Sequence, residues 1–471
     1  MRYLTVLAVL LFIAAGSSFA QQSVGFSNPD NIDPILDYRL PDWGYSNFYL
    51  DFDAAASGRD QKDRSGTNVD KGGEIFIRPN YDLYRESEAR IFRFNTGLAL
   101  SFRNSASKSS SASTSNNSER TSQGLGSNLS ASANLREYVT ERSFLYAGGS
   151  TSFEYDRSKR EVRENDVLDE KRFNYRRRID FNPRLGYGFG RIRNVGPVIR
   201  AVRLAERLDA LPANVSMGNQ DIRSAADQFT RYDGYQQRYD RPEKYFWGDM
   251  NENTTADLSA LGSFDMLYLT DVFNEAIGQR LEGWEVYGGA EFNYDNNLLR
   301  TENPLAQPEL INRNQRIRKS VGAFLNSRWY KNISLRQQWG FIGNASVNYQ
   351  LGDSYSSSLE RTFDFETGII WLWNMTDRFL LDAALWNIYS REKFANEGVG
   401  SRSEDYSEWN NNINLNLNFN YFIENSLSLT FSFNSSLRHS GNTETDHTLD
   451  NRRFTVGGTL GLRYYFSRNL Y

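Results

Sequence analysis

Residues 452–467 read RRFTVGGTLGLRYYFS, and side chains of two kinds alternate along this stretch. Its odd positions, from Thr455 to Ser467, are mostly small or polar. Its even positions are apolar or glycine and end in aromatic residues: Phe454, Val456, Gly458, Leu460, Leu462, Tyr464 and Phe466. A β-strand turns successive side chains to opposite faces, so the stretch predicts a strand with one apolar face and one polar face.

The same alternation recurs many times along the chain. Its clearest instance is residues 412–421, where asparagine alternates with Ile413, Leu415, Leu417, Phe419 and Tyr421. No segment is large and apolar enough to cover so many apolar faces, whereas a barrel whose apolar face meets lipid needs no cover. We count about fourteen such strands. The predicted fold class is therefore an all-β membrane protein, an antiparallel transmembrane β-barrel; the alternative is a large secreted sandwich or solenoid.

Composition excludes several classes of protein. Hydrophobic residues make up 39% of the 471 residues and the mean hydropathy is -0.63, which excludes a helical membrane protein. The net charge of -4 gives no reason to expect a nucleic-acid partner. With no cysteine, the chain has no disulfide, thiolate metal site or cysteine nucleophile, and with two histidines, His439 and His447, it is poorly supplied for a histidine-based site. We expect no cofactor and no metal.

The N-terminus carries the features of a secretion signal. Arg2 precedes an apolar run from Leu4 to Ala15, and Ser18-Phe19-Ala20 is a small-x-small cleavage site. We therefore predict a signal peptide at residues 1–20, with a retained anchor as the alternative. Residues 21–43 contain three prolines and predict an irregular periplasmic segment.

Loop lengths alternate along the predicted barrel. Polar stretches at 57–71, 108–122 and 156–171 predict long loops, and short turns lie between them. Long loops are extracellular and short turns periplasmic in outer-membrane barrels, so both chain ends are predicted in the periplasm. Strands 1–6 are expected within residues 44–190 and strands 7–14 within 283–471.

Residues 191–282 interrupt the strands, because their apolar period changes from two to about 3.6. Three apolar stripes predict three helices, the third a longer one over 258–277, and hence a periplasmic helical insertion. The insertion also holds an aromatic cluster, which we expect to form its own small core: Tyr239, Tyr245, Phe246 and Trp247. Such an insertion suits recruitment of a periplasmic protein, cell-wall binding or gating; the alternative is an inert helical hairpin under the rim.

The secretion signal, the alternating strands and the closing GLRYYF resemble Gram-negative outer-membrane β-barrel proteins of the porin-like kind. The resemblance implies contact with outer-membrane lipid and with the barrel-assembly machinery, for which Gly461, Tyr464 and Phe466 match the C-terminal assembly signal. One departure is that the chain continues to Tyr471. The segment Gly188–Ile192 followed by helices is similar to barrels of the Bacteroidetes–Chlorobi group.

Alternation also predicts which side chains line the lumen. The inward set mixes both charges with asparagine and serine, which suits a water-filled channel or export pore for small polar or saccharide-like solutes; a polar network that closes the lumen is the structural alternative. The predicted lining residues are Arg93, Arg176, Arg178, Arg184, Glu291, Arg328, Arg336, Asp364, Glu366, Asp382, Asn414, Asn416, Asn418 and Arg463.

Two other function classes stay open from the sequence. A non-transporting surface or anchor protein would use its loops or its insertion for adhesion or partner binding. An enzyme is not expected, and the only residues that keep that class open are the inward acids Asp364, Glu366 and Asp382, as a paired-carboxylate site.

Overall fold

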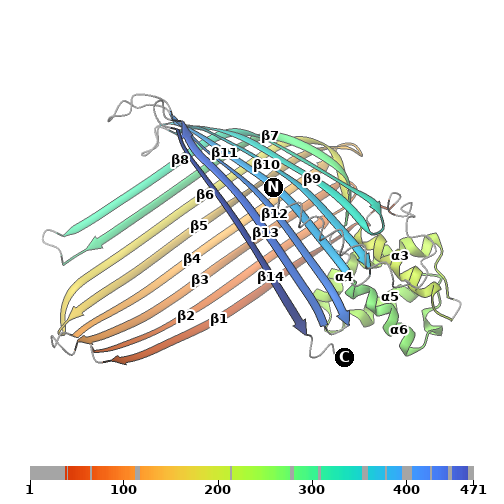
Figure 1. Ribbon diagram of the computed structural model, residues 1–471, viewed down its shortest axis with the longest axis horizontal. Helices are drawn as coiled ribbons and strands as arrows, with labels where there is room; N and C mark the ends of the chain where they lie inside the picture. The colour runs from red at the N-terminus through yellow and green to blue at the C-terminus, as the bar shows by residue number, and fades with distance from the viewer. Residues whose placement is uncertain are drawn as a thin grey trace.

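The computed structural model describes residues 35, 38–39, 41–63, 66–111, 117–212, 215–275, 280–305, 309–352, 359–376, 379–394, 406–424, 427–443 and 448–464. They form one antiparallel sheet of fourteen strands, in which every strand pairs with its neighbours in sequence (Figure 1). The predicted strand number, pairing direction and helical insertion are confirmed. The strands are β1 (Trp43–Asp63), β2 (Gly66–Glu86), β3 (Arg90–Ser111), β4 (Asn117–Tyr138), β5 (Ser143–Glu164), β6 (Val167–Asn194), β7 (Leu281–Asn303), β8 (Leu310–Ser334), β9 (Gln337–Gln350), β10 (Leu359–Thr376), β11 (Phe379–Phe394), β12 (Tyr406–Glu424), β13 (Leu427–Thr443) and β14 (Thr448–Tyr464).

The first six strands are longer than predicted, at 21 to 28 residues each. The predicted loop at 156–171 is instead strand on both sides of a tight turn at Asn165 and Asp166, whose φ angles of 49° and 68° suit a two-residue hairpin. The loop predicted at 57–71 is also mostly strand, and so are the described parts of 108–122, whose residues 112–116 lie outside the described part. Antiparallel pairing satisfies the backbone whatever the side chains are, so polar segments extend the ladder.

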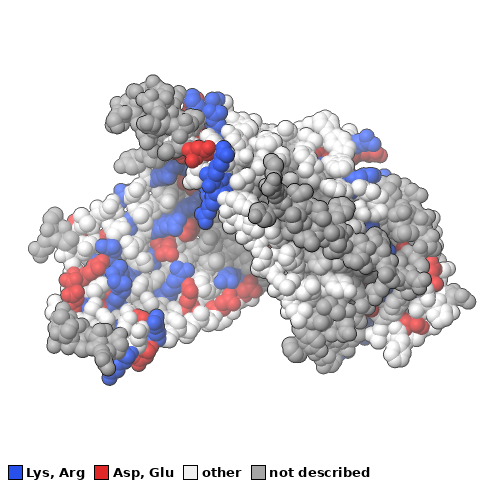
Figure 2. Space-filling model, in the orientation of Figure 1, with Lys and Arg blue, Asp and Glu red and all other residues white. Residues whose placement is uncertain are grey.

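The sheet has an apolar face and a polar face. On the apolar face large side chains are exposed in strand after strand, for example Leu50 at 60%, Phe52 at 64%, Leu460 at 71% and Leu462 at 66%. Figure 2 shows both faces in one view: charged residues gather over β1–β6, whereas the surface over β11–β14 carries few. An exposed apolar surface that continues over most strands indicates contact with lipid.

None of the described helices is long and apolar enough to cross a membrane.

The helical insertion lies between β6 and β7 at one end of the sheet (Figure 1). It contains α3 (Gly196–Asp209), α4 (Asn219–Arg238), α5 (Pro242–Asn253), η1 (Leu258–Ala260), α6 (Ser263–Thr270) and η2 (Asp271–Asn274). The prediction of one long third helix is wrong: extended Gly262 breaks it, and its N–H donates to Oδ2 of Asp265 at 3.2 Å, which begins α6. Helix α5 was not among the three predicted helices.

The insertion has a core of its own. Phe246 is fully buried, and its ring centroid lies 5.0 Å from that of Phe229 and 4.8 Å from that of Phe273. Trp247 packs against the same core. The expected aromatic core is confirmed for these two residues, whereas Tyr239 stacks on the exposed Tyr245.

Contacts from outside the helices fix the insertion to the sheet. Buried Tyr38 shares a hydrogen bond of 2.8 Å with the Thr230 hydroxyl, so this part of the predicted segment 21–43 packs on the insertion. Arg280 is fully buried and donates to Oδ1 of Asn332 at 3.4 Å, to the Leu335 carbonyl at 3.3 Å and to Oδ1 of Asn374. Burial, with a smaller contribution from Arg203, lowers the pKa of Arg280 to about 10. The insertion is therefore held at the turn between β8 and β9 and at the end of β10.

Acid is expected to loosen the insertion through Asp221. Its carboxylate accepts bonds from the Thr255 N–H and hydroxyl, both at 2.7 Å, and from the Gly218 N–H at 3.1 Å. Burial opposes ionisation, but these bonds together hold the pKa of Asp221 below its usual value. A carboxyl group whose pKa is lower in the folded state stabilises the fold at pH values above its unfolded-state pKa of about 3.9. This stabilisation is lost as the pH falls through the folded-state pKa. Limited proteolysis of the insertion should therefore accelerate below about pH 4.

The matched variants are Asp221→Asn and, as a control, Asp209→Asn on the surface. The first should be cleaved faster at neutral pH and respond less to acid, and the second should behave like the unmodified protein. An unchanged acid response in Asp221→Asn would exclude Asp221 as its origin.

Candidate functional site on the polar face

Two nearly inaccessible carboxylates organise the polar face of β4–β9. Glu285, 1% exposed, pairs with Arg136 at 3.2 Å and accepts from Nε of Arg328 at 2.7 Å. Glu291, 3% exposed, pairs with Arg184 at 2.8 Å and accepts from Nδ2 of the Asn348 amide at 2.8 Å. The pairs Arg184–Glu291 and Arg328–Glu285 join neighbouring strands, whereas Arg136 of β4 reaches Glu285 on β7. These acids and bases leave this part of the polar face with little unbalanced charge.

An aromatic cluster lies against this ionic network: Tyr138, Phe144, Tyr146, Tyr287 and Phe324. The ring centroid of Tyr287 lies 4.8 Å from that of Tyr146 and 5.9 Å from that of Phe144, and Cζ of Arg136 lies 5.4 Å from it. This cluster was not predicted from the sequence, because only polar side chains were expected on the inward face. The alternation does indicate the cluster. Leu145 and Val286 lie on the apolar face, so the adjacent rings of Phe144, Tyr146 and Tyr287 point to the polar face.

Several predicted lining residues are paired in the structure. Arg184 and Glu291 contact each other, and Arg328 contacts Glu285, as described above. Arg178 pairs with Asp180 and with Asp295, each at 3.1 Å. Arg176 lies 3.7 Å from Glu154, and Nδ2 of Asn344 donates to Glu366 at 2.9 Å. Most of the predicted arginines therefore have a partner on the same or a neighbouring strand.

Arg336, which we predicted on a strand, lies in the turn between β8 and β9. The apolar residue before it, Leu335, belongs to the core of the insertion, and these two residues form the turn. Arg93 lies on β3, where it is exposed between Tyr84 and Asn134 in the register.

The asparagine row of β12 faces small and polar neighbours. Asn414, Asn416 and Asn418 pair in register with Ser436, Asn434 and Ser432 of β13, respectively. On its other side Asn418 is opposite Asp382 of β11. The row thus continues the polar face towards the last strand.

The enzyme alternative depends on three acids, Asp364, Glu366 and Asp382, and these do not form one site. Asp364 and Glu366 share one face of β10, but Asp382 is in register with Leu372, six positions further along that strand from Glu366. At roughly 3.3 Å per residue this separates Asp382 from Glu366 by about 20 Å. Asp364 and Glu366 therefore remain neighbours on β10, and Asp382 does not join them.

Four predicted side chains fall outside the described part. These are Arg463, Tyr464, Phe466 and His447. Gly461 is described and pairs in register with Thr430 of β13. His439 is described too; its Nε2 lies 2.5 Å from Oδ1 of Asp450 on the neighbouring strand. In the described residues no group of three or more His, Cys, Asp or Glu side chains is arranged to hold a metal ion.

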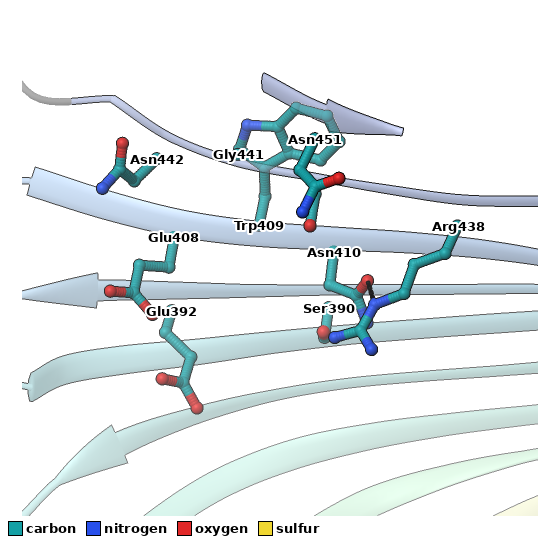
Figure 3. Close-up of a pocket in the computed structure, with 10 residues that line it drawn as sticks. Ser390, Glu392, Glu408, Trp409, Asn410, Arg438, Gly441, Asn442 and Asn451 are labelled. Atoms are coloured by element: carbon teal, nitrogen blue, oxygen red, sulfur yellow. Dashed lines mark hydrogen bonds between the residues drawn. The ribbon is translucent and has the colours of Figure 1, made fainter. Parts of the chain in front are cut away.

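An open groove of about 390 Å³ crosses the polar face of β11–β14 (Figure 3). Glu392 and Glu408 lie side by side in it, directly opposite each other in register. Nε of Arg438 donates to Oδ1 of Asn410 at 3.0 Å at the other end of the groove. The groove offers carboxylate, guanidinium and amide groups to a polar solute.

The strand order, the exposed apolar face and the polar face opposite it define a membrane protein of the β-barrel class. No protein-family model matches the chain, and no curated protein matches it. Among solved structures it is similar to the translocator domain of the autotransporter NalP from Neisseria meningitidis, with 10% identity, a TM-score of 0.20 and coverage of 92% of this chain and 91% of that one. It is also similar to the transport unit of the autotransporter AIDA-I from Escherichia coli, with 10% identity, a TM-score of 0.18 and coverage of 95% and 94%.

A deletion mutant of the TodX monoaromatic hydrocarbon channel is similar at 8% identity and a TM-score of 0.25, over 94% of this chain and 93% of that one. These solved structures are outer-membrane β-barrels. At TM-scores this low the likeness does not extend to function or substrate.

Proposed function

We propose that the chain is an outer-membrane pore for small polar or saccharide-like solutes, in which the sheet closes with its polar face inward. One observation carries the proposal: the face opposite the exposed apolar surface is polar, and its buried acids are paired with arginines. A lining of paired charges, amides and hydroxyls holds water without a strong field of one sign, and so favours uncharged polar solutes over ions.

The same proposal assigns the remaining parts. Residues 1–20 direct export, both chain ends lie in the periplasm, and the C-terminal strand is read by the barrel-assembly machinery. The helical insertion then lies on the periplasmic side, where it gates the pore or docks a periplasmic partner. Its contacts through Arg280 and Leu335 with the turn between β8 and β9 support this role, because they couple the helices to the wall of the pore.

Planar-bilayer recordings of the purified protein test the pore. We expect stepwise conductance that reproduces from one protein preparation to the next. The second sample joins Asn194 to Leu281 by a short turn, since these two residues are already paired in register. Higher conductance of this variant would identify the insertion as a gate, equal conductance would identify it as a docking element, and silence of both proteins would overturn the pore.

A second candidate is a surface anchor, favoured by the length of the first hairpins. The strands β1–β6 contain 21 to 28 residues each. A transmembrane strand needs about 9–11. Ten or more residues of each strand therefore project beyond the hydrocarbon layer as polar hairpins. Silence in the bilayer, together with loss of cell adhesion when residues 57–71 are shortened, would support the anchor instead of the pore.

A further inference from the structure

A second hollow on the polar face, of about 490 Å³, crosses β1–β6; we call it the trough. Its floor consists of small residues that follow one another across the strands in two adjacent register rows: Gly97, Ser130, Ser132, Ser150 and Ser152. It lies on the charge-bearing face of β1–β6 that is visible in Figure 2. Its volume falls in the range of about 300–1,000 Å³ that small-molecule sites occupy.

Larger polar groups form the two rims, and contacts between them hold them in place. At one rim Nδ2 of Asn95 donates to the Asp82 carboxylate. At the other, the Ser152 hydroxyl donates to Oδ2 of Asp180 at 2.9 Å, and Arg178 pairs with the same carboxylate at 3.1 Å. The rims are therefore pre-organised, which lowers the ordering cost of binding.

One aromatic ring completes the trough. Tyr49 of β1 lies opposite Asn80 in register and is 41% exposed, whereas its neighbours Phe48 and Leu50 belong to the apolar face. An exposed ring offers an apolar surface to C–H groups while its hydroxyl stays available for hydrogen bonding. The groove of Figure 3 lacks this feature, because its Trp409 belongs to the set of β12 residues that alternates onto the apolar face.

We infer that the trough is a binding subsite for a neutral saccharide, an assignment that rests on the proposed pore and names its class of solute. Sugar hydroxyls donate and accept, and the trough presents both kinds of partner: carboxylates that accept, a guanidinium that donates, and amides and serine hydroxyls that do both. The carboxylates of Asp82 and Asp180 repel an anion, and the guanidinium of Arg178 repels a cation. Tyr49 supplies the flat surface for a pyranose ring.

Maltotriose, a neutral glucose trimer, is the probe, added to the full chain in planar bilayers. We expect a saturable decrease of single-channel current. Ser130→Leu, which fills the floor, should abolish it, and Tyr49→Ala should weaken the apparent affinity by about tenfold while Tyr49→Phe changes it little. The control is Ser122→Leu on the same face of the same strand, eight positions from Ser130 and outside the trough; it should leave the decrease unchanged. A decrease that survives Ser130→Leu would overturn the inference.

Titration calorimetry of the same four variants in detergent separates failure of the site from failure of the pore. Maltotriose binding with this pattern of variants, in a protein that does not conduct, would keep the saccharide site and reject the pore. Conductance without saturable maltotriose binding in either experiment would keep the pore and reject the site.

Discussion

Replacing Glu285 with alanine is expected to destabilise the folded protein by about 3 kcal/mol. The carboxylate is 1% exposed and pairs with both Arg136 and Arg328. Its removal leaves two guanidinium groups, on side chains only 19% and 32% exposed, close together without their shared counter-charge. Urea unfolding of the protein in lipid vesicles, followed by tryptophan fluorescence, measures the loss.

The control for this prediction is Glu137→Ala. Glu137 also pairs with an arginine, Arg90 at 2.5 Å, but their side chains are 38% and 58% exposed. Solvent screens such a pair, so its removal should leave the unfolding midpoint nearly unchanged. Glu285→Gln, which keeps the shape and removes the charge, should fall between the two. Equal effects of Glu137→Ala and Glu285→Ala would show that burial of Glu285 contributes nothing.

Replacing Gly188 with leucine is expected to prevent assembly of the sheet, and Gly188→Ala to destabilise it by about 1–3 kcal/mol. Gly188 lies between Phe144 and Tyr287 in register. A Cβ atom there would meet the Phe144 ring and lie 2.5 Å from Cβ of Tyr287, which is attached directly to the backbone of β7 and has little freedom to move. The yield of folded protein in outer-membrane fractions, compared by heat-dependent gel mobility, measures the effect.

Two further variants make this prediction specific. At Gly58 of β1 no atom lies within 4 Å of the place that a Cβ atom would take, so Gly58→Ala should assemble normally. Shortening the opposing ring with Phe144→Leu should partly restore Gly188→Ala. Failure of this double variant to gain any yield over Gly188→Ala would assign the defect to the contact with Cβ of Tyr287 on β7 and not to the Phe144 ring.

The fold could be predicted from the sequence wherever the two faces of a strand differ. Alternation at 412–421 and 452–467 marked strands, because asparagine or threonine opposes large apolar residues there. At 57–71 and 156–171 both faces of the strands are polar, so apolar and polar residues do not alternate there. Backbone pairing nevertheless continues through these segments. The strands were therefore predicted too short where the hydrogen-bonded ladder extends beyond the apolar layer.

The sequence predicted on which face of the sheet a residue of the site lies, but not which residue it contacts. Arg184 and Glu291 were both assigned to the inward face, but their contact depends on the pairing of β6 with β7 across the helical insertion. Asp382 shows the converse, since its predicted face places it near Asp364 and Glu366 only if the register is ignored. Register arises from many backbone pairs together, and no single residue in the sequence reports it.

The hydrogen bond from the Val195 N–H to the Arg280 carbonyl, 2.9 Å long, bears on the order in which the molecule assembles. It closes residues 195–280 into a loop whose two ends meet directly below the last pair of β6 and β7, Asn194 and Leu281. Closing an unstructured loop of that length instead of a hairpin turn of a few residues costs roughly 2–3 kcal/mol of chain entropy. A helical core that packs before the strands meet would bear this cost, and β6 and β7 would then join as though a tight turn connected them. Every pairing in the sheet then becomes a local one, and the fourteen strands can add one after another along the chain.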